Sequence, residues 1–583
     1  MSSRRQRSGY TQLDSRSSSD SGSAALPPRA RSKALRWAAP AALLLLTLLA
    51  FAPALRGGWI WDDDAYVTDN AELESLAGLG RIWLTPGATP QYYPLVFTSF
   101  WIERQIFGVH PFPFHLANVL LHAGSAVLLW LVLKRVGMRG AWLGAALFAI
   151  HPLQVESVAW VTERKNVLGG LFLFASALAW VRARPPEGES SPRLWWTSFL
   201  LFAGALLSKT VTAALPVGLF LLGWWKRPRE WRRDLVALLP FFALGAAFGL
   251  LTAWMEVHHV GAKGVEWNLS RIERGSVAAR AFCFYLGKMI WPVRLAFSYS
   301  RWTPRAADLM LYLPIAAACL LLPWLLRGRF GRGPIVAMGW YAAALFPALG
   351  FLDVYPMRYS WVADHFQYFA AAGPLALLGA GLVRIRPRPL PVLLIALLVV
   401  LTFRQSAIYE SAETLWTDTL RKNPESVLAH GQLGMLLASS GRDEESLAHF
   451  RQALELDPKE RRTWISLAAA LGRLKRYPES IEASDHAIAI EPADGNAWLN
   501  RGVAKVRLGQ WQDGADDLAH GFALGFETGR ARQYRAIALA RLGRYAEASA
   551  EAERAVALEP RDNDARMLLE RCREEARASR QMP

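Results

Sequence analysis

Residues 35–67 read LRWAAPAALLLLTLLAFAPALRGGWIWDDDAYV, an apolar run that ends shortly before three consecutive aspartates. The run from Leu35 to Leu55 has the length needed to cross a bilayer. Carboxylates at the point where a span meets water are partly desolvated, so they are costly to keep there. We therefore interpret Asp62, Asp63 and Asp64 as a candidate site for a base or a cation.

The composition is that of a membrane protein with a soluble part. Of the 583 residues 52% are hydrophobic, including 25 Trp and 27 Phe, which is too apolar for a single soluble domain. Up to about Phe403 the chain is a series of apolar runs, and beyond it the composition is that of a soluble helical protein. The net charge of +17 arises from basic residues between the runs, which is typical of cytoplasmic loops and not of nucleic-acid binding. The three cysteines are too scattered for a disulfide framework or a thiolate metal site.

The order of the basic loops predicts a topology of about eleven spans. Placing every basic cluster in the cytoplasm puts the amino terminus inside and the carboxyl-terminal part outside. Segment 278–292 is apolar too, but a span there would place the basic cluster at 327–332 on the outer side of the membrane. We therefore expect this segment to be re-entrant or interfacial. The spans are predicted near 35–55, 116–134, 140–158, 167–182, 194–208, 210–226, 234–254, 308–326, 333–351, 366–383 and 391–404.

This path predicts that distant segments meet on the outer face. The three aspartates, the turn 151–166, Lys209, the loop 255–307 and the segment 353–365 all fall on that side. Such convergence is what a single active site requires.

A repeat of 34 residues occupies the carboxyl-terminal part. Pro424, Pro458 and Pro492 keep this spacing, as do Gly441, Lys475, Gly509 and Gly543. The period and its small residues at helix crossings are the signature of tetratricopeptide repeats. Four repeats from about 425 to 560 predict a helical solenoid with a docking groove, the alternative being a structural spacer.

The predicted fold is all-α: a polytopic membrane bundle followed by the repeat solenoid. The predicted domains are a disordered cytoplasmic tail at 1–33, a membrane domain at 34–405 with a first outer loop at 57–115, and the repeat domain at 406–577.

Several motifs together resemble one family. They are GWIWDDDAYVTDN at 58–70, YYPL at 92–95, FHLANVLLH at 114–122, HPLQVESVAW at 151–160, ERKN at 163–166 and LSK at 207–209. In this order they resemble the transmembrane and tetratricopeptide repeat-containing O-mannosyltransferases and their bacterial relatives. These belong to the C-type glycosyltransferases, multispan enzymes that use polyprenyl-phosphate sugars.

The resemblance implies roles for particular residues. An acidic pair in the first outer loop is the expected catalytic element and maps best onto Asp63 and Asp64, with Asp62 and Glu156 as further candidates. Sugar transfer also needs cations that neutralise the departing phosphate. The candidates for binding this phosphate are Lys209, Arg164, Lys165, Arg358 and His365.

Two positions depart from the family pattern. His365 stands where relatives carry an arginine suited to a bidentate phosphate contact, which weakens the expected lipid-phosphate site unless Arg358 substitutes. Gln154 stands where bacterial relatives often carry histidine. We expect no cofactor and no metal, although two carboxylates could hold a divalent cation.

The resulting hypothesis is an enzyme of the bacterial inner membrane. It would move a hexose, mannose being favoured, from a polyprenyl-phosphate carrier to Ser or Thr hydroxyls of secreted or envelope proteins, with the acceptor protein docked on the repeats. One alternative is a glycosyltransferase acting on a lipid-linked glycan or envelope polymer. Another is a non-catalytic membrane-anchored repeat scaffold. A transporter is disfavoured because the charged residues gather on one side and not at the midplane.

Overall fold

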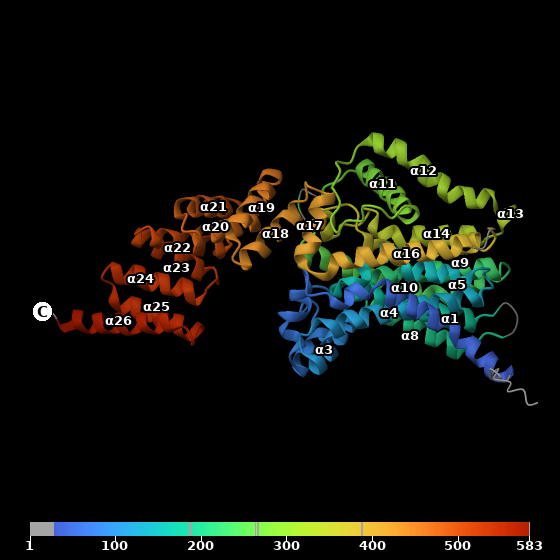
Figure 1. The fold of residues 1–583 in the computed structure, drawn as a ribbon, viewed down its shortest axis with the longest axis horizontal. Coiled ribbons are helices and arrows are strands. Elements are labelled where there is room, and N and C mark those ends of the chain that lie inside the picture. The colour runs from blue at the N-terminus through green and yellow to red at the C-terminus, as the bar shows by residue number, and fades with distance from the viewer. Residues whose placement is uncertain (1–27, 186–188, 263, 265–266, 386–388, 582–583) are drawn as a thin grey trace, which may run out of the picture. The chain divides into compact units, whose positions relative to one another are not determined.

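The computed structural model describes residues 28–185, 189–262, 264, 267–385 and 389–581, so most of the predicted tail at 1–33 lies outside the described residues. Every regular element in the described residues is helical (Figure 1), which confirms the all-α prediction. The chain divides into two compact units at Ala42. The first contributes the beginning of helix α1 (Pro28–Ala50), and the second, Leu43–Pro583, holds all other described helices.

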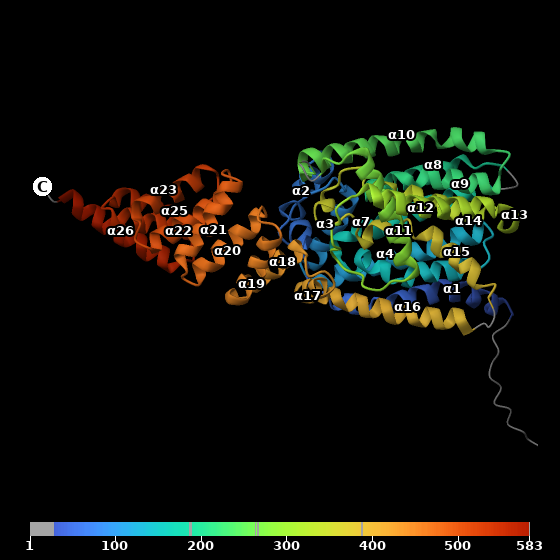
Figure 2. The same ribbon diagram turned by 90° about the horizontal axis from the view of Figure 1, so that it is seen from above.

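Fourteen helices of the described residues lie in the predicted membrane domain outside its first outer loop. In the two views the longer helices of the second unit run largely side by side (Figures 1 and 2). The fourteen helices are α1, α4 (Pro111–Arg135), α5 (Ala141–Ile150), α6 (Val155–Ala159), α7 (Arg164–Ala183), α8 (Pro192–Leu206), α9 (Leu215–Lys226), α10 (Trp231–Met255), α11 (Arg271–Ile290), α12 (Ala306–Leu325), α13 (Arg327–Phe330), α14 (Gly333–Leu345), α15 (Ala372–Leu382) and α16 (Pro389–Ala407), of which α6 and α13 are single short turns.

Five helical segments of the described residues are long and apolar enough to cross a membrane. They are Pro111–Arg135, Val161–Ala183, Trp231–Val260, Ala306–Leu325 and Pro389–Glu410. Of the other predicted spans, 35–55 appears as the apolar stretch Trp37–Ala50 of α1, and the rest appear as short helices. The count of eleven therefore stays a prediction. The predicted span 140–158 shows the reason, since α5 ends before Pro152, and a proline disfavours helical backbone at the residue before it.

The first outer loop is largely helical. After Asp63 come a short turn at Asp64–Thr68, then α2 (Leu76–Leu84) and α3 (Pro94–Phe107). Tyr66, Phe97, Phe100 and Phe114 form part of a separate buried cluster beneath this loop. The loop is therefore a folded element with its own core.

Segment 278–292, predicted to be re-entrant or interfacial, lies in α11. This helix starts with a capping box between Ser270 and Glu273 and buries one face that includes Val277, Ala281 and Tyr285. It is not among the five segments above. Its position relative to the membrane stays a prediction.

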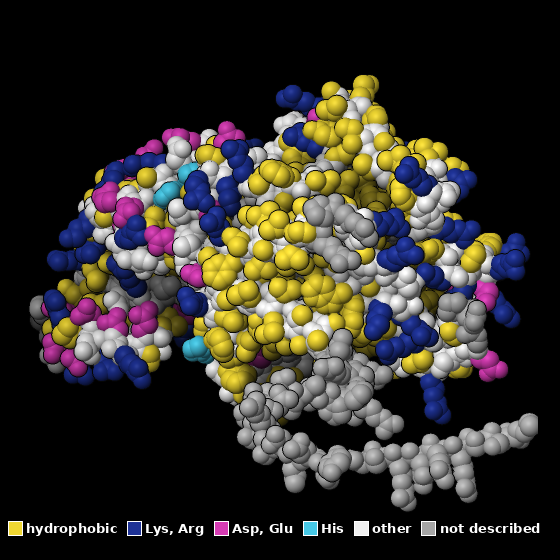
Figure 3. All heavy atoms as spheres, turned by 45° about the vertical axis from the view of Figure 1, so that its right-hand side comes forward, with side chains coloured by type: hydrophobic (Ala, Val, Ile, Leu, Met, Phe, Trp, Pro, Cys, Tyr) yellow, Lys and Arg dark blue, Asp and Glu magenta, His cyan; other side chains and the backbone are white. Residues whose placement is uncertain are grey.

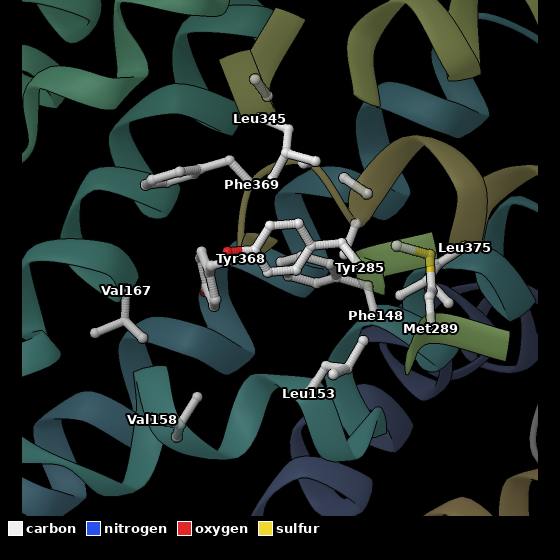
Figure 4. Packing of buried hydrophobic residues seen from close by; sticks show 14 of the residues in the cluster. Phe148, Leu153, Val158, Val167, Tyr285, Met289, Leu345, Tyr368, Phe369 and Leu375 are labelled. Atoms are coloured by element: carbon white, nitrogen blue, oxygen red, sulfur yellow. The ribbon is translucent and has the colours of Figure 1, made fainter. Parts of the chain in front are cut away.

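The core of the bundle joins helices from both halves of the membrane domain. Tyr368 lies among Phe148, Val167 and Phe369 (Figure 4), and its ring meets Phe148 at 5.4 Å. Its hydroxyl donates to His122 Nδ1 at 2.8 Å, because His122 Nε2 already donates to the Ala149 carbonyl. The hydrogen bond between His122 and Tyr368 thus fixes the position of α4 in an apolar core.

The repeats confirm the 34-residue register. Four helix pairs follow the leading helix α17 (Ala412–Lys422), and α26 (Asn563–Gln581) ends the stack. The pairs are α18 (Val427–Ser439) with α19 (Asp443–Leu456), α20 (Arg461–Arg473) with α21 (Tyr477–Ile490), α22 (Gly495–Arg507) with α23 (Trp511–Ala523), and α24 (Gly529–Arg541) with α25 (Tyr545–Leu558). The turn inside each pair needs a left-handed residue. It is Gly in the first, third and fourth repeats and Lys475, at φ 62°, in the second.

Close packing of α5 on α15 yields a testable prediction. A Cβ at Gly379 would lie 2.4 Å from the Gly144 backbone nitrogen, whereas a Cβ at Gly381 would meet nothing within 4 Å. We expect Gly379→Val to lower the free energy of unfolding by about 1–3 kcal/mol, because the two helices must separate. Gly381→Val is the matched control. Equal thermal midpoints of the two variants in detergent would contradict this packing.

Candidate active site

The aspartate loop is tied to the segment that follows α6. Both oxygens of Asp63, which is fully buried, accept hydrogen bonds. Oδ1 accepts from the Thr162 backbone nitrogen at 2.9 Å and from its hydroxyl at 2.7 Å, and Oδ2 accepts from the Ile60 nitrogen at 2.9 Å. Burial raises the pKa of Asp63 to about 7, although these hydrogen bonds oppose the rise. Asp63 therefore anchors the loop.

The residue before the three aspartates has a strained backbone. Trp61 has φ 43°, a left-handed conformation that is unfavourable for a bulky residue. Its ring stacks on Trp160 at 5.5 Å and meets the edges of Phe297 and Trp416, the latter from α17. The aromatic contacts hold the strained turn that immediately precedes Asp62.

Asp62 and Asp64 have different surroundings. Asp64 is exposed, and its Oδ1 accepts from the Ala65 nitrogen at 2.7 Å. Asp62 is half-buried, and desolvation raises its pKa to about 6 while the positive charge of Lys165 opposes the rise. Asp64 and Glu163 add to the rise through their negative charges. The pKa of Asp62 therefore depends on the charges of Lys165 and Glu163.

Glu163 is the centre of a buried charge cluster. It is 1% exposed and pairs with Lys165 Nζ at 2.9 Å and with Lys209 Nζ at 3.1 Å. Asn166 Nδ2 donates to the same carboxylate at 2.6 Å, and His365 Nε2 lies 3.9 Å from it. Two lysines and a histidine from three separate segments therefore converge on one carboxylate.

Glu156 positions His365. Its Oε1 accepts from His365 Nδ1 at 2.8 Å, and its Oε2 accepts from the His365 backbone nitrogen at 3.0 Å. This contact fixes the imidazole with Nε2 toward Glu163. The preceding residue, Asp364, accepts hydrogen bonds from the Tyr299 hydroxyl, which ties the loop 255–307 to the same cluster.

Arg164 and Arg358 lie in other environments. The guanidinium of Arg164 is buried and donates to Asn118, Ser99, the Phe114 carbonyl and both oxygens of Glu103. All five of its N–H groups are used, so it holds α7 against α3 and α4. Arg358 pairs with Glu460, just before α20, at 3.3 Å and is partly exposed.

Sequence reasoning missed Glu163, Thr162 and Asn166 as site residues. Glu163 could have been inferred, because buried lysines need a counter-charge and the motif ERKN places one beside them. Thr162 gave no comparable signal. Among the described residues no group of three or more His, Cys, Asp or Glu side chains is arranged to hold a metal ion.

Removing the central carboxylate tests the cluster. We expect Glu163→Gln to lower the free energy of unfolding by about 3–5 kcal/mol, because two buried lysines lose their counter-charge. A second substitution, Lys209→Met, should restore part of this loss. Glu74→Gln, in an exposed pair with Arg104, is the control and should change stability by less than about 1 kcal/mol. Thermal unfolding in detergent measures all three, and an unstable double variant with no recovery would contradict the pairing.

Two family models and several curated proteins match parts of this chain. Residues 90–254 match the family model described as dolichyl-phosphate-mannose-protein mannosyltransferase, and residues 402–461 match a tetratricopeptide repeat model. Protein O-mannosyl-transferase TMTC4 of Homo sapiens is 30% identical over 193 residues, which are 28% of this chain and 26% of that protein. Protein O-mannosyl-transferase Tmtc3 of Drosophila melanogaster is 22% identical over 525 residues, which are 72% of this chain and 55% of that protein.

The matched regions thus span between about a quarter and about half of these relatives. A solved tetratricopeptide repeat protein of Thermus thermophilus, TTC0263, is 21% identical over 30% of this chain and 94% of its own, with a TM-score of 0.24. The family matches cover both the membrane part and the first repeats. They confirm the resemblance predicted from the motifs: in the matched regions this chain is similar to the transmembrane and tetratricopeptide repeat-containing O-mannosyltransferases.

Proposed function

We propose that this protein is a membrane glycosyltransferase that moves a hexose, mannose being favoured, from a polyprenyl-phosphate carrier to Ser or Thr hydroxyls of proteins outside the bacterial inner membrane. The observation that carries the proposal is the placement of Asp62, a carboxylate with its pKa raised to about 6, in the field of Lys165 and Glu163. A base and phosphate-binding cations next to each other are what sugar transfer to a hydroxyl requires.

Each residue of the site has a separate role in the proposed sugar transfer. Asp62 accepts the proton of the acceptor hydroxyl as its oxygen forms a bond to the anomeric carbon. The bond between that carbon and the phosphate oxygen breaks, and the carrier phosphate leaves with its electron pair. Lys165 and Lys209 neutralise the negative charge that develops on this phosphate. His365 Nε2 lies beside Glu163, the carboxylate that both lysines contact. A single displacement inverts the anomeric centre.

This assignment moves the base from the pair expected from the resemblance. Asp63 has both oxygens engaged by Thr162 and Ile60, which suits an anchor better than a base. Asp64 is exposed and contacts its neighbour Ala65. Asp63 and Glu156 therefore act as positioning residues, and Arg164 stays outside the proposed phosphate site because its donors are used.

The repeats begin beside the aspartate loop, which supports docking of an acceptor protein. Trp416 of α17 contacts Trp61, and Glu460 contacts Arg358 of the outer segment. A polypeptide bound in the groove of the repeats would have its hydroxyls near Asp62. An acceptor that is a lipid-linked glycan would need no such groove.

The first test replaces the proposed base. We expect Asp62→Asn to lower mannose transfer by about 10²–10⁴-fold, because the acceptor proton loses its acceptor. Asp69→Asn, exposed in the same loop, is the matched control and should keep full activity. The assay uses full-length protein in proteoliposomes with polyprenyl-phosphate mannose, followed by glycopeptide mass spectrometry of envelope proteins. Full activity of Asp62→Asn would contradict Asp62 as the base. No transfer by the unaltered protein would favour the scaffold, and transfer to a lipid-linked glycan alone would select the other transferase.

The second test follows the pH dependence. Asp62 acts as a base only when ionised, so kcat/KM should fall about tenfold per unit of pH below about pH 6. Lys165 lowers the pKa of Asp62, so Lys165→Gln should move this acid limb to higher pH as well as reduce the rate. Asp69→Asn should leave the limb in place. A profile that stays flat down to pH 5 would contradict Asp62 as the base.

A further inference from the structure

We infer that the protein has a second anionic site, which binds the phosphate of an anionic phospholipid at the end of the bundle away from the candidate active site. Helices α4 and α7 begin at the active site, where Asn118 meets Arg164, and both end at a basic pocket. The 20 residues of α7 span about 30 Å, so the two sites are separated by the length of a membrane helix.

The pocket gathers cations from three segments that are distant in sequence. It has a volume of about 160 Å³, and its lining includes Arg135 from α4, Arg184 after α7, and Lys226 with Arg227 at the end of α9. Its wall also includes Trp180, whose ring lies 5.3 Å from the Arg184 guanidinium. The predicted topology places all these positions at the cytoplasmic surface, where anionic lipids attract basic residues.

The positive charge is only partly compensated. Asp234 is fully buried, and it accepts from Arg184 at 2.8 Å and from Arg227 at 2.9 Å. Glu230 lies 3.8 Å from Arg227. Four cations therefore face two carboxylates, and neither Arg135 nor Lys226 forms an ion pair with a carboxylate of the described residues. An anion in the pocket would neutralise this excess charge.

A large apolar cavity adjoins the basic pocket and identifies the kind of anion. Its volume is about 960 Å³, and it shares Val136, Gly137 and Leu222 with the pocket. Its walls come from α4, α7, α9, α12, α14 and α15 and are mostly aliphatic. In Figure 3 a broad hydrophobic surface adjoins a region of clustered Lys and Arg side chains. A head-group phosphate in the pocket with acyl chains in the cavity uses both spaces, whereas inorganic phosphate uses only the first.

Two kinds of variant test the site in the full-length protein. Arg135→Gln with Lys226→Gln removes the two cations that have no carboxylate partner and leaves the buried Asp234 pairs intact. Its matched control is Arg182→Gln with Arg229→Gln, two exposed residues that do not line the pocket. Gly381→Trp puts a bulky ring on a residue that lines the apolar cavity and has open space at its Cβ. Its control is Gly249→Trp on α10, which also has open space and lies outside the cavity.

Binding is measured by native mass spectrometry of delipidated protein titrated with dioleoylphosphatidylglycerol, dioleoylphosphatidylcholine or inorganic phosphate. We expect one tightly bound phosphatidylglycerol, with affinity lowered about tenfold or more by the charge variant and by Gly381→Trp, and unchanged in both controls. Equal retention of the two lipids, or equal loss in variants and controls, overturns the proposal. Binding of inorganic phosphate as tight as that of the lipid, insensitive to Gly381→Trp, overturns the lipid as the ligand.

Discussion

The bond between Asp63 and Thr162 is the contact on which the site depends. It joins the loop after the first helix to the segment that carries Glu163 and Lys165, although the two partners are 99 residues apart. The aromatic packing of the strained Trp61, and hydrogen bonds of Gly58 to the Glu410 carbonyl and of Arg104 to the Val67 carbonyl, hold the loop besides it. The same buried carboxylate thus fixes where its neighbour Asp62 stands relative to the lysines.

At each end of the bundle a buried carboxylate pairs with two cations. At one end Glu163 lies between Lys165 and Lys209, and at the other Asp234 lies between Arg184 and Arg227. In each case one buried carboxylate accepts from two cations that come from different segments. A buried charge must be paired, so these carboxylates specify which helices meet. Both clusters keep positive charge beyond what the carboxylate neutralises, which suits them to bind anions.

Much of this could be predicted from the sequence. The 34-residue period fixed the helix pairs of the repeats, and the alternation of apolar runs with basic loops predicted which segments share a side. The contacts Asp63–Thr162, Glu163–Lys209 and Glu156–His365 join segments that this reasoning placed on one face. Pattern alone could not tell which aspartate is an anchor, because that depends on backbone hydrogen bonds across 99 residues. Nor could it separate Arg164 from the lysines, since its partner Glu103 lies in a helix without a recognisable motif.

The most direct test is a cryo-electron microscopy structure of the full-length protein with a polyprenyl-phosphate sugar bound. The account predicts the phosphate within hydrogen-bonding distance of Lys165 and Lys209 Nζ, with the anomeric carbon on the side of Asp62. A phosphate bound elsewhere, with Asp62 turned away from the sugar, would contradict the account.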